Sequence, residues 1–249
     1  MILYKYLHPD RAADLLQHRL IRFTQPSSFN DPFDSQPCFD SVVESEFIEE
    51  VCQLDDPEET QRFRAQVIEA FQEPEVKDWY TSGTLNNIAI LCLAERPENI
   101  LMWAHYARSD QGLVVGLDVD HASLKNRADG ETRRCQKVSY TLDRPKRETL
   151  TELTAQEAFY TKSPDWGYEQ EWRILDGVVH ADEVRGADKS VYLFQFDPQA
   201  VREVILGARM QEESVRLVTD ALKHQDYKHV RLQRAEMHPE QYRVTICDV

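Results

Sequence analysis

Alternating and helically spaced apolar residues divide the start of the chain into clear elements. Residues 2–7 are rich in β-branched and aromatic side chains, which is typical of a strand. The next three residues, His8-Pro9-Asp10, favour a helix start because proline suits the first helical turn. Apolar residues then recur at helical spacing to about residue 18, and residues 20–24 form a second apolar run. The chain is therefore predicted to open with a strand, a helix and a strand joined by short connections.

The rest of the chain repeats these two patterns. Further strands are predicted at 85–93, 113–119, 134–142, 166–175, 191–196, 204–207, 229–234 and 242–247. Further helices are predicted at 44–53, 58–72, 98–108, 151–162 and 211–224. Strands are too numerous for a simple doubly wound parallel sheet, so we expect an α+β fold with a mixed or antiparallel sheet. No linker or internal repeat is evident, which predicts a single domain over 1–249 with a helical insertion at about 41–82.

Composition and charge narrow the class of protein. The chain has 249 residues, of which 41% are hydrophobic and 29% charged, as in ordinary globular proteins. Its net charge of −15 repels nucleic acid, which argues against a general role in coating DNA or RNA. Basic residues at 133–137 and 144–147 are candidates for a local basic patch, with solvated loop charges as the alternative interpretation.

The expected location follows from signals that the sequence lacks. The first residues show no charged leader followed by an apolar core, and no run approaches the roughly 18 apolar residues of a membrane span. The 5 cysteines are scattered and include no Cys-x-x-Cys pair, so neither a zinc ribbon nor a disulfide framework is indicated. We therefore expect a cytoplasmic protein with no membrane partner and no bound metal. The sequence carries no signal for an oligomeric state.

The candidate chemistry centres on a Glu-x-Glu pattern. A strand at 166–175 places Glu169, Glu171 and Arg173 on one face, with successive side chains ~7 Å apart. Two close carboxylates need a cation or a bound substrate to compensate them. One can act as a general base or charge stabiliser while the other orients a substrate hydroxyl or nucleophile, and Arg173 can neutralise them. The alternative is an exposed polar face whose Glu–Arg pair contributes less than about 1 kcal/mol.

A second candidate surface is the loop at 25–34. It contains two prolines and several turn-forming polar residues, and Asn30 and Asp31 can bond their own backbone. Both a structural turn and a ligand-binding loop remain open for it. The sequence has no phosphate-binding, dinucleotide-binding, nucleophile-elbow or zinc-protease motif. With 8 glycines in the whole chain, a glycine-rich phosphate cradle is not expected.

Several short segments together match the pattern of a known family. They are Tyr4-Lys5-Tyr6, Phe29-Asn30-Asp31-Pro32-Phe33, Trp103-Ala104-His105-Tyr106 with Gly112, the Trp-x-Tyr-Glu-x-Glu-x-Arg core within Lys162 to Arg173, Phe196-Asp197-Pro198 and Val204-Ile205-Leu206-Gly207. In this combination the chain resembles domain-of-unknown-function family 2971 over nearly its whole length. The family name implies no activity.

A second resemblance does imply one. The opening strand, helix and strand, with Glu-x-Glu on a late strand, are similar to ADP-ribosyltransferases, whose split mixed sheet holds NAD in a cleft. By that resemblance Glu171 stabilises an oxocarbenium-like ribosyl cation and Glu169 assists the acceptor, while Tyr106 stacks on nicotinamide. A first-strand Arg or His holds NAD in that family. Lys5 is the nearest candidate here, which departs from the pattern, and the Ser-Thr-Ser element of the arginine-modifying branch is not evident.

These observations lead to one hypothesis and two alternatives. The hypothesis is a metal-independent enzyme that cleaves or transfers the glycosidic bond of a nucleotide such as NAD, with Glu171 and Glu169 catalytic. The expected substrate-binding residues are Lys5, Tyr6, Asn30, Asp31, Trp103, Tyr106, Lys162, Trp166 and Arg173. The first alternative is a non-catalytic ligand- or protein-binding domain in which the glutamates lie in satisfied salt bridges and the acidic helices at 44–72 meet a basic partner. The second is a nuclease in which Asp31, Glu169 and Glu171 bind a divalent cation.

Overall fold

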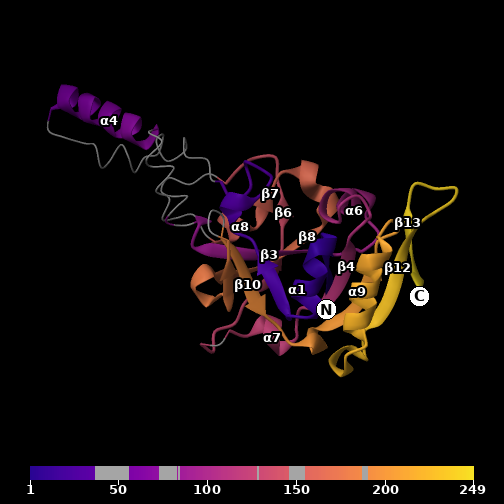
Figure 1. Cartoon of the computed structure of the whole chain (residues 1–249). Coiled ribbons are helices and arrows are strands. Elements are labelled where there is room, and N and C mark those ends of the chain that lie inside the picture. The colour runs from indigo at the N-terminus through magenta and orange to yellow at the C-terminus, as the bar shows by residue number, and fades with distance from the viewer. Residues whose placement is uncertain (37–55, 73–82, 84, 128, 146–154, 187–189) are drawn as a thin grey trace. The chain divides into compact units, whose positions relative to one another are not determined.

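The protein combines helices with mixed, mostly antiparallel sheets, which confirms the predicted α+β class (Figure 1). The computed structural model describes residues 1–36, 56–72, 83, 85–127, 129–145, 155–186 and 190–249. The chain divides into two compact units. Unit 1 comprises Met1–Thr24, Ile90–Lys137 and Gly167–Val249, and unit 2 comprises Gln25–Ala89 and Val138–Trp166. The single domain over 1–249 stays a prediction.

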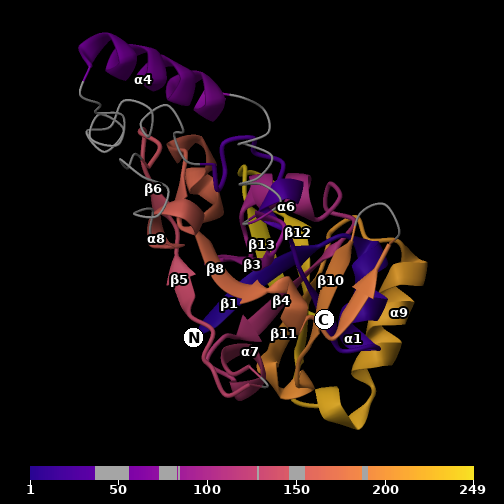
Figure 2. The same ribbon diagram turned by 90° about the vertical axis from the view of Figure 1, so that its left-hand side faces the viewer.

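The largest sheet has eight strands in the order β13-β12-β11-β4-β1-β3-β8-β5. Their bounds are β1 Ile2–Leu7, β3 Ile88–Ala94, β4 Leu113–Asp118, β5 Cys135–Lys137, β8 Glu171–Gly177, β11 Val201–Leu206, β12 Arg231–Met237 and β13 Val244–Asp248. Strand β1 pairs antiparallel with β4, and the two run side by side in Figure 2. Strands β11 and β12 pair in parallel, joined by a helical crossover, so the sheet is mixed as predicted.

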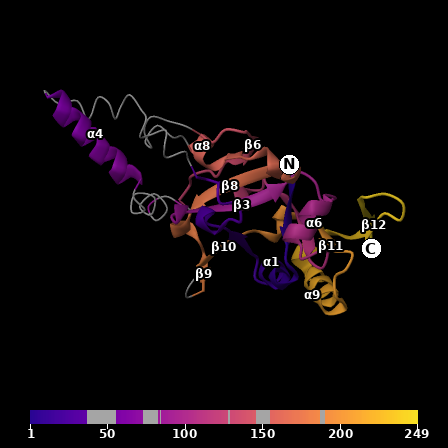
Figure 3. The same ribbon diagram turned by 90° about the horizontal axis from the view of Figure 1, so that it is seen from above.

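A smaller sheet and several helices complete unit 1. The sheet has the order β2-β10-β9, with β2 at Leu20–Phe23, β9 at Glu183–Arg185 and β10 at Val191–Gln195. The helices are η1 Pro9–Arg11, α1 Ala12–Leu16, α6 Ile100–Tyr106, α7 Ala122–Lys125, η5 Val178–His180, η6 Pro198–Ala200, α9 Glu212–Leu222 and η7 Gln225–Tyr227. Helices α1 and α9 lie side by side, and α6 lies against β1 (Figures 1 and 3).

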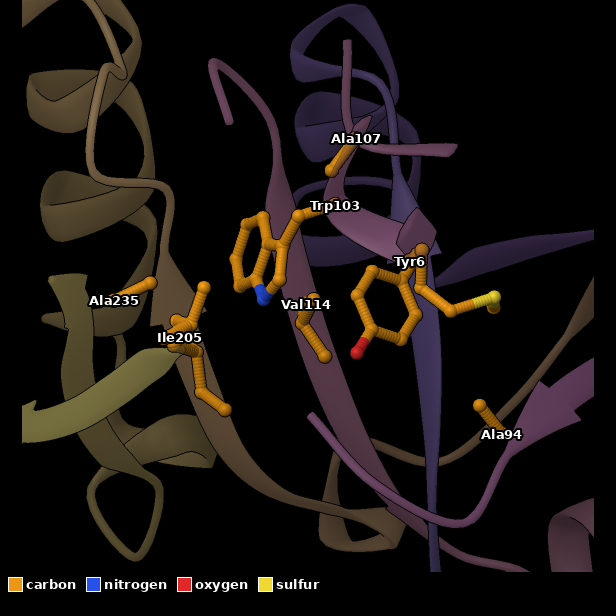
Figure 4. Packing of buried hydrophobic residues seen from close by; sticks show 9 residues of the cluster. Tyr6, Ala94, Trp103, Ala107, Val114, Ile205 and Ala235 are labelled. Carbon is orange, nitrogen blue, oxygen red and sulfur yellow. The ribbon is translucent and has the colours of Figure 1, made fainter. Parts of the chain in front are cut away.

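A row of apolar side chains crosses the sheet beneath α6. Tyr6, Val114 and Ile205 are register partners on the neighbouring strands β1, β4 and β11. They pack with Trp103 of α6 in one buried cluster (Figure 4). Because side chains alternate between the faces of a strand, Lys5 lies on the opposite face of β1 from Tyr6. The sheet therefore has an apolar face under α6 and a second face that carries the Lys5 amine.

The chain turns back to the sheet after α6 through a tight backbone approach. Arg108, Ser109 and Asp110 all adopt positive φ angles of 49°, 54° and 66°. A Cβ atom on Gly112 would lie only 2.1 Å from the carbonyl oxygen of Leu7. Glycine is therefore required for this approach, and it lies several residues beyond the last residue of the helix, Tyr106.

Unit 2 contains short elements and one longer helix. They are η2 Pro26–Ser28, α4 Pro57–Gln72, β6 Ser139–Tyr140, α8 Ala155–Phe159, β7 Thr161–Lys162 and the start of η4 Pro164–Glu169. Helix α4 confirms the helix predicted at 58–72, and Asp56 caps it by accepting a hydrogen bond from the Glu58 amide (2.7 Å). The helix predicted at 44–53, much of the insertion at 41–82 and residues 146–147 of one basic run lie outside the described residues.

Two predicted elements are broken by changes in hydrogen bonding. The strand predicted at 134–142 is two strands, β5 and β6, because the amides of Ser139 and Thr141 donate to the carbonyls of Tyr160 and Lys162 (2.7 and 3.0 Å). The helix predicted at 151–162 ends at Phe159 within the described residues, since residues 161–162 form β7. Among the described residues, no helix is long and apolar enough to cross a membrane.

Candidate functional site

Glu169 and Glu171 do not lie on one strand, which corrects the predicted geometry. Glu169 ends the 3-10 helix η4, and Glu171 is the first residue of β8. Gln170 between them has a positive φ of 46°, so the alternation of a strand is interrupted at that residue. The two carboxylates consequently have different partners, and the local break begins at Pro164, which starts a helical turn.

Glu171 forms a buried ion pair with Arg173. Arg173 Nε donates to Oε1 of Glu171 at 2.8 Å, and Nη2 donates to Oε2 at 3.0 Å. The side chains are 0% exposed for Arg173 and 5% exposed for Glu171. The guanidinium therefore bonds both carboxylate oxygens away from water, where each charge stabilises the other. The expected contact between these residues is present, while the exposed polar face that was the alternative is not.

Glu169 is held from α6 instead. Tyr106 Oη donates to Glu169 Oε1 at 2.5 Å, and Glu169 is 4% exposed. One residue earlier, Tyr168 Oη lies 3.0 Å from His105 Nδ1. Asn99, which caps α6, also donates from its side chain to the Tyr168 carbonyl at 2.6 Å. Helix α6 and its cap residue thus fix the segment that carries Glu169 through three polar contacts.

Lys5 lies on the face of β1 opposite Tyr6 and within electrostatic reach of both glutamates. Its Nζ donates to the Cys92 carbonyl of β3 at 2.9 Å. The side chain is partly accessible, yet enough protein surrounds the ammonium that burial lowers the Lys5 pKa, while Glu171 and Glu169 oppose that shift. Burial and the nearby Glu171 raise the pKa of the Cys92 thiol. These residues form a charged cluster, comprising Lys5, Cys92, Glu169, Glu171 and Arg173.

Tyr6 and Trp103 are core residues. Trp103 is 0% exposed and its Nε1 donates to the Pro97 carbonyl at 2.7 Å. Tyr6 meets Trp103 edge to face, with ring centroids 5.5 Å apart, and its hydroxyl donates to the Arg96 carbonyl at 2.8 Å. Figure 4 shows both rings packed among aliphatic side chains. Their predicted contact with a substrate stays a prediction, although packing already accounts for their position.

Unit 2 brings together two of the other predicted residues, Asp31 and Lys162. Both line a cavity of about 250 Å³. Asp31 Oδ1 accepts from the Phe33 amide at 2.9 Å, whereas its Oδ2 is buried with no hydrogen-bond partner. Lys162 Nζ lies 3.5 Å from Asp34 Oδ2 and 4.8 Å from the centroid of the Trp166 ring. Asp34 was not predicted, because only the folded chain brings it to Lys162.

Asn30 lies outside this cavity, and the candidate metal ligands form no metal site among the described residues. Asn30 is exposed at the loop surface and does not line this cavity. Within the described ranges, no group of three or more His, Cys, Asp or Glu side chains is placed to hold a metal ion. The nuclease alternative itself stays a prediction. Sequence analysis also missed the bond from Tyr4 Oη to Glu203 Oε1 (2.7 Å), which joins β1 to β11.

Fold and site together define an α+β protein with a mixed sheet, a charged cluster in unit 1 and an acid-lined cavity in unit 2. Residues 102–174 match the family described as "Protein of unknown function (DUF2971)", which is the family whose resemblance the sequence motifs indicated. The match includes the motifs around Trp103 and Glu171 but not those near Lys5 or Asn30. No curated protein and no solved structure matches the chain. The resemblance to ADP-ribosyltransferases stays a prediction.

Proposed function

We propose that this chain is a cytoplasmic small-molecule-binding protein in which the Glu171–Arg173 pair is structural. Glu171 offers both oxygens to a guanidinium of its own chain, so its charge is compensated without a substrate cation. A carboxylate in this state is less available to stabilise a developing positive charge elsewhere. This supports the binding alternative for Glu171, one of the two glutamates that the alternative expects in salt bridges.

The observation that carries this proposal is the buried, unpartnered Oδ2 of Asp31. A buried polar oxygen without a partner costs roughly 1–3 kcal/mol. Asp31 is 6% exposed and lines the 250 Å³ cavity of unit 2, so a ligand that donates a hydrogen bond there removes this cost. The neighbouring Asp34 lies close to Lys162 and is also buried. These acidic groups suit a ligand with ammonium, guanidinium or hydroxyl donors.

Substitution of Asp31 by asparagine tests this proposal. Asparagine keeps the acceptor for the Phe33 amide and removes the charged oxygen, so the ligand-free variant is expected to be at least as stable as the wild type. We expect a panel of amines, guanidines and polyols, screened by thermal shift, to contain ligands that stabilise the wild type and not Asp31→Asn. Asp165→Asn, at an exposed position of unit 2, is the control and should respond like the wild type. Equal stabilisation of Asp31→Asn by every ligand in the panel would contradict the proposal.

The charged cluster favours a second candidate, an enzyme that cleaves or transfers the glycosidic bond of a nucleotide such as NAD. The supporting observation is that burial lowers the pKa of Lys5 while Glu171 and Glu169 lie within electrostatic reach. A lysine of lowered pKa beside carboxylates is an arrangement common at catalytic sites. In this function Glu171 would stabilise an oxocarbenium-like transition state and Glu169 would orient the acceptor.

Release of nicotinamide from NAD separates the two candidates. If the chain is such an enzyme, Glu171→Gln should reduce the rate by about 100-fold or more, because one charged stabiliser of the transition state is lost. Glu183→Gln, at an exposed residue of β9, should leave the rate unchanged. Wild-type protein that releases no nicotinamide, with or without an added acceptor protein, rules out this second candidate for NAD and leaves the binding proposal standing.

A further inference from the structure

A cavity in unit 1 collects basic side chains from three consecutive elements. It has a volume of about 200 Å³ and lies among β1, the η1–α1 segment and β2. Its charged lining consists of Lys5, His8, Arg11, Asp14 and Arg22, and the rest of the wall is mainly aliphatic. In a chain with a net charge of −15, the basic side chains of Lys5, Arg11 and Arg22 around one small cavity need an explanation.

Arg22 is the least compensated of these groups. Its Nε is buried with no hydrogen-bond partner, and Arg22 makes no ion pair with any residue that the structure describes. Burial lowers the pKa of the Arg22 guanidinium, and the positive charge of Arg11 lowers it further. An arginine offers its donors in a planar fork, and here that fork meets no carboxylate.

The one acidic residue of the lining, Asp14, is already engaged by two arginines. Asp14 Oδ1 accepts from Arg185 Nη1 at 2.5 Å, and Asp14 Oδ2 accepts from Arg11 Nη1 at 3.4 Å. Lys5 Nζ has a carbonyl rather than a carboxylate as its hydrogen-bond partner. Glu171 and Glu169 lie within electrostatic reach of Lys5, and Arg11 meets Asp14, so Arg22 is the cation of this lining that an anion from outside the chain would balance.

We propose that this cavity binds a phosphoryl group, either as free phosphate or as the phosphate of a small molecule. Three cationic side chains from different elements surround a tetrahedral oxyanion better than a flat carboxylate, which a single arginine fork satisfies. The volume accommodates one phosphoryl group with part of a carrier. This site belongs to unit 1 and shares Lys5 with the charged cluster, whereas the Asp31 cavity belongs to unit 2.

Calorimetric titration at constant ionic strength tests the site. The probes are inorganic phosphate and ADP, with chloride and acetate as the anion controls. We expect phosphate or ADP to bind the wild type and Arg22→Met to weaken that binding at least tenfold, because the uncompensated guanidinium is removed. Arg62→Met, at an exposed position of α4, should bind like the wild type. Asp31→Asn should also bind like the wild type, which separates this site from the proposed function.

The results of the titration distinguish the two sources of the phosphoryl group and also show whether the proposal fails. Tighter binding of ADP than of phosphate identifies a carried phosphoryl group, and the reverse identifies the free anion. Binding of chloride or acetate as tight as that of phosphate overturns the proposal, as does unchanged affinity in Arg22→Met. If Arg22→Met does not fold, Arg11→Met takes its place. In the wild type, bound phosphate should also protect the Lys5 amine from reductive methylation. This measurement needs no variant, and absence of protection counts against the site.

Discussion

Replacing Arg173 with methionine should lower the free energy of unfolding by about 3–5 kcal/mol, because Glu171 would remain buried without its partner. Both side chains are almost completely removed from water, and the two hydrogen bonds of 2.8 and 3.0 Å disappear together. Methionine keeps an unbranched apolar stem of similar length, so the lost charge dominates the effect. Urea denaturation followed by circular dichroism measures this change.

An exposed pair with the same geometry supplies the matched control. Arg231 Nε and Nη2 donate to the two carboxylate oxygens of Asp248 at 2.7 and 2.8 Å, but these side chains are 60% and 64% exposed. Arg231→Met should therefore cost less than about 1 kcal/mol. The comparison tests burial, since in both pairs one guanidinium donates to both oxygens of a carboxylate.

The double variant Arg173→Met with Glu171→Gln shows where the cost in stability comes from. It separates the lost attraction between the two charges from the presence of a buried carboxylate without its partner. If the cost in Arg173→Met comes from an uncompensated carboxylate, removing that charge should recover much of the lost stability. A cost in Arg173→Met no larger than that in Arg231→Met would show that the Glu171–Arg173 pair is not structural, and this part of the proposed function would be wrong.

The strand at 2–7 was predicted accurately because its signals are local. A β-branched and aromatic run is followed at once by His8-Pro9, and the structure has β1 at Ile2–Leu7. The same holds for 113–119 and 211–224, whose patterns are bounded by Gly112 and by polar residues. An element can be predicted from the sequence when the residues that end it lie next to it in the chain.

The break at Gln170 could not be read in this way. Its positive φ belongs to a residue with no glycine-like freedom, and the alternating pattern continues through it. Pro164 and Gly167 were the available signals for a helical turn before the strand, since proline favours the first turn and strands rarely contain glycine. The sequence therefore predicted which residues matter in this stretch but not that Glu169 and Glu171 have separate partners.

The charged cluster and the Asp31 cavity depend on contacts between distant parts of the chain. Lys5 reaches Cys92, and Lys162 approaches Asp34, across separations that no local pattern encodes. Arg22 did carry a signal, because an arginine between Ile21 and Phe23 in a short apolar strand has few ways to reach water. Only the folded chain shows that Arg22 has no carboxylate partner among the described residues.

Substituting Trp103 by alanine should lower the free energy of unfolding by about 3–5 kcal/mol. The indole is fully buried, packs edge to face on Tyr6 and donates a hydrogen bond to the Pro97 carbonyl. Alanine leaves a large cavity under α6 and an unsatisfied carbonyl, and α6 also carries the Tyr106 that holds Glu169. Urea denaturation followed by far-ultraviolet circular dichroism gives the change without relying on tryptophan fluorescence.

Two further variants decide whether Trp103 acts through packing or through a ligand. Trp103→Phe keeps most of the apolar contact and should lose less stability than Trp103→Ala. Tyr242→Ala, at a fully exposed aromatic residue, should change stability by less than about 0.5 kcal/mol. If Trp103→Ala instead unfolds like the wild type and loses only binding of a nucleotide, the substrate-binding role predicted from the sequence is correct and the core assignment is wrong. Because the ring is inaccessible beneath α6, we expect stability and any binding to fall together.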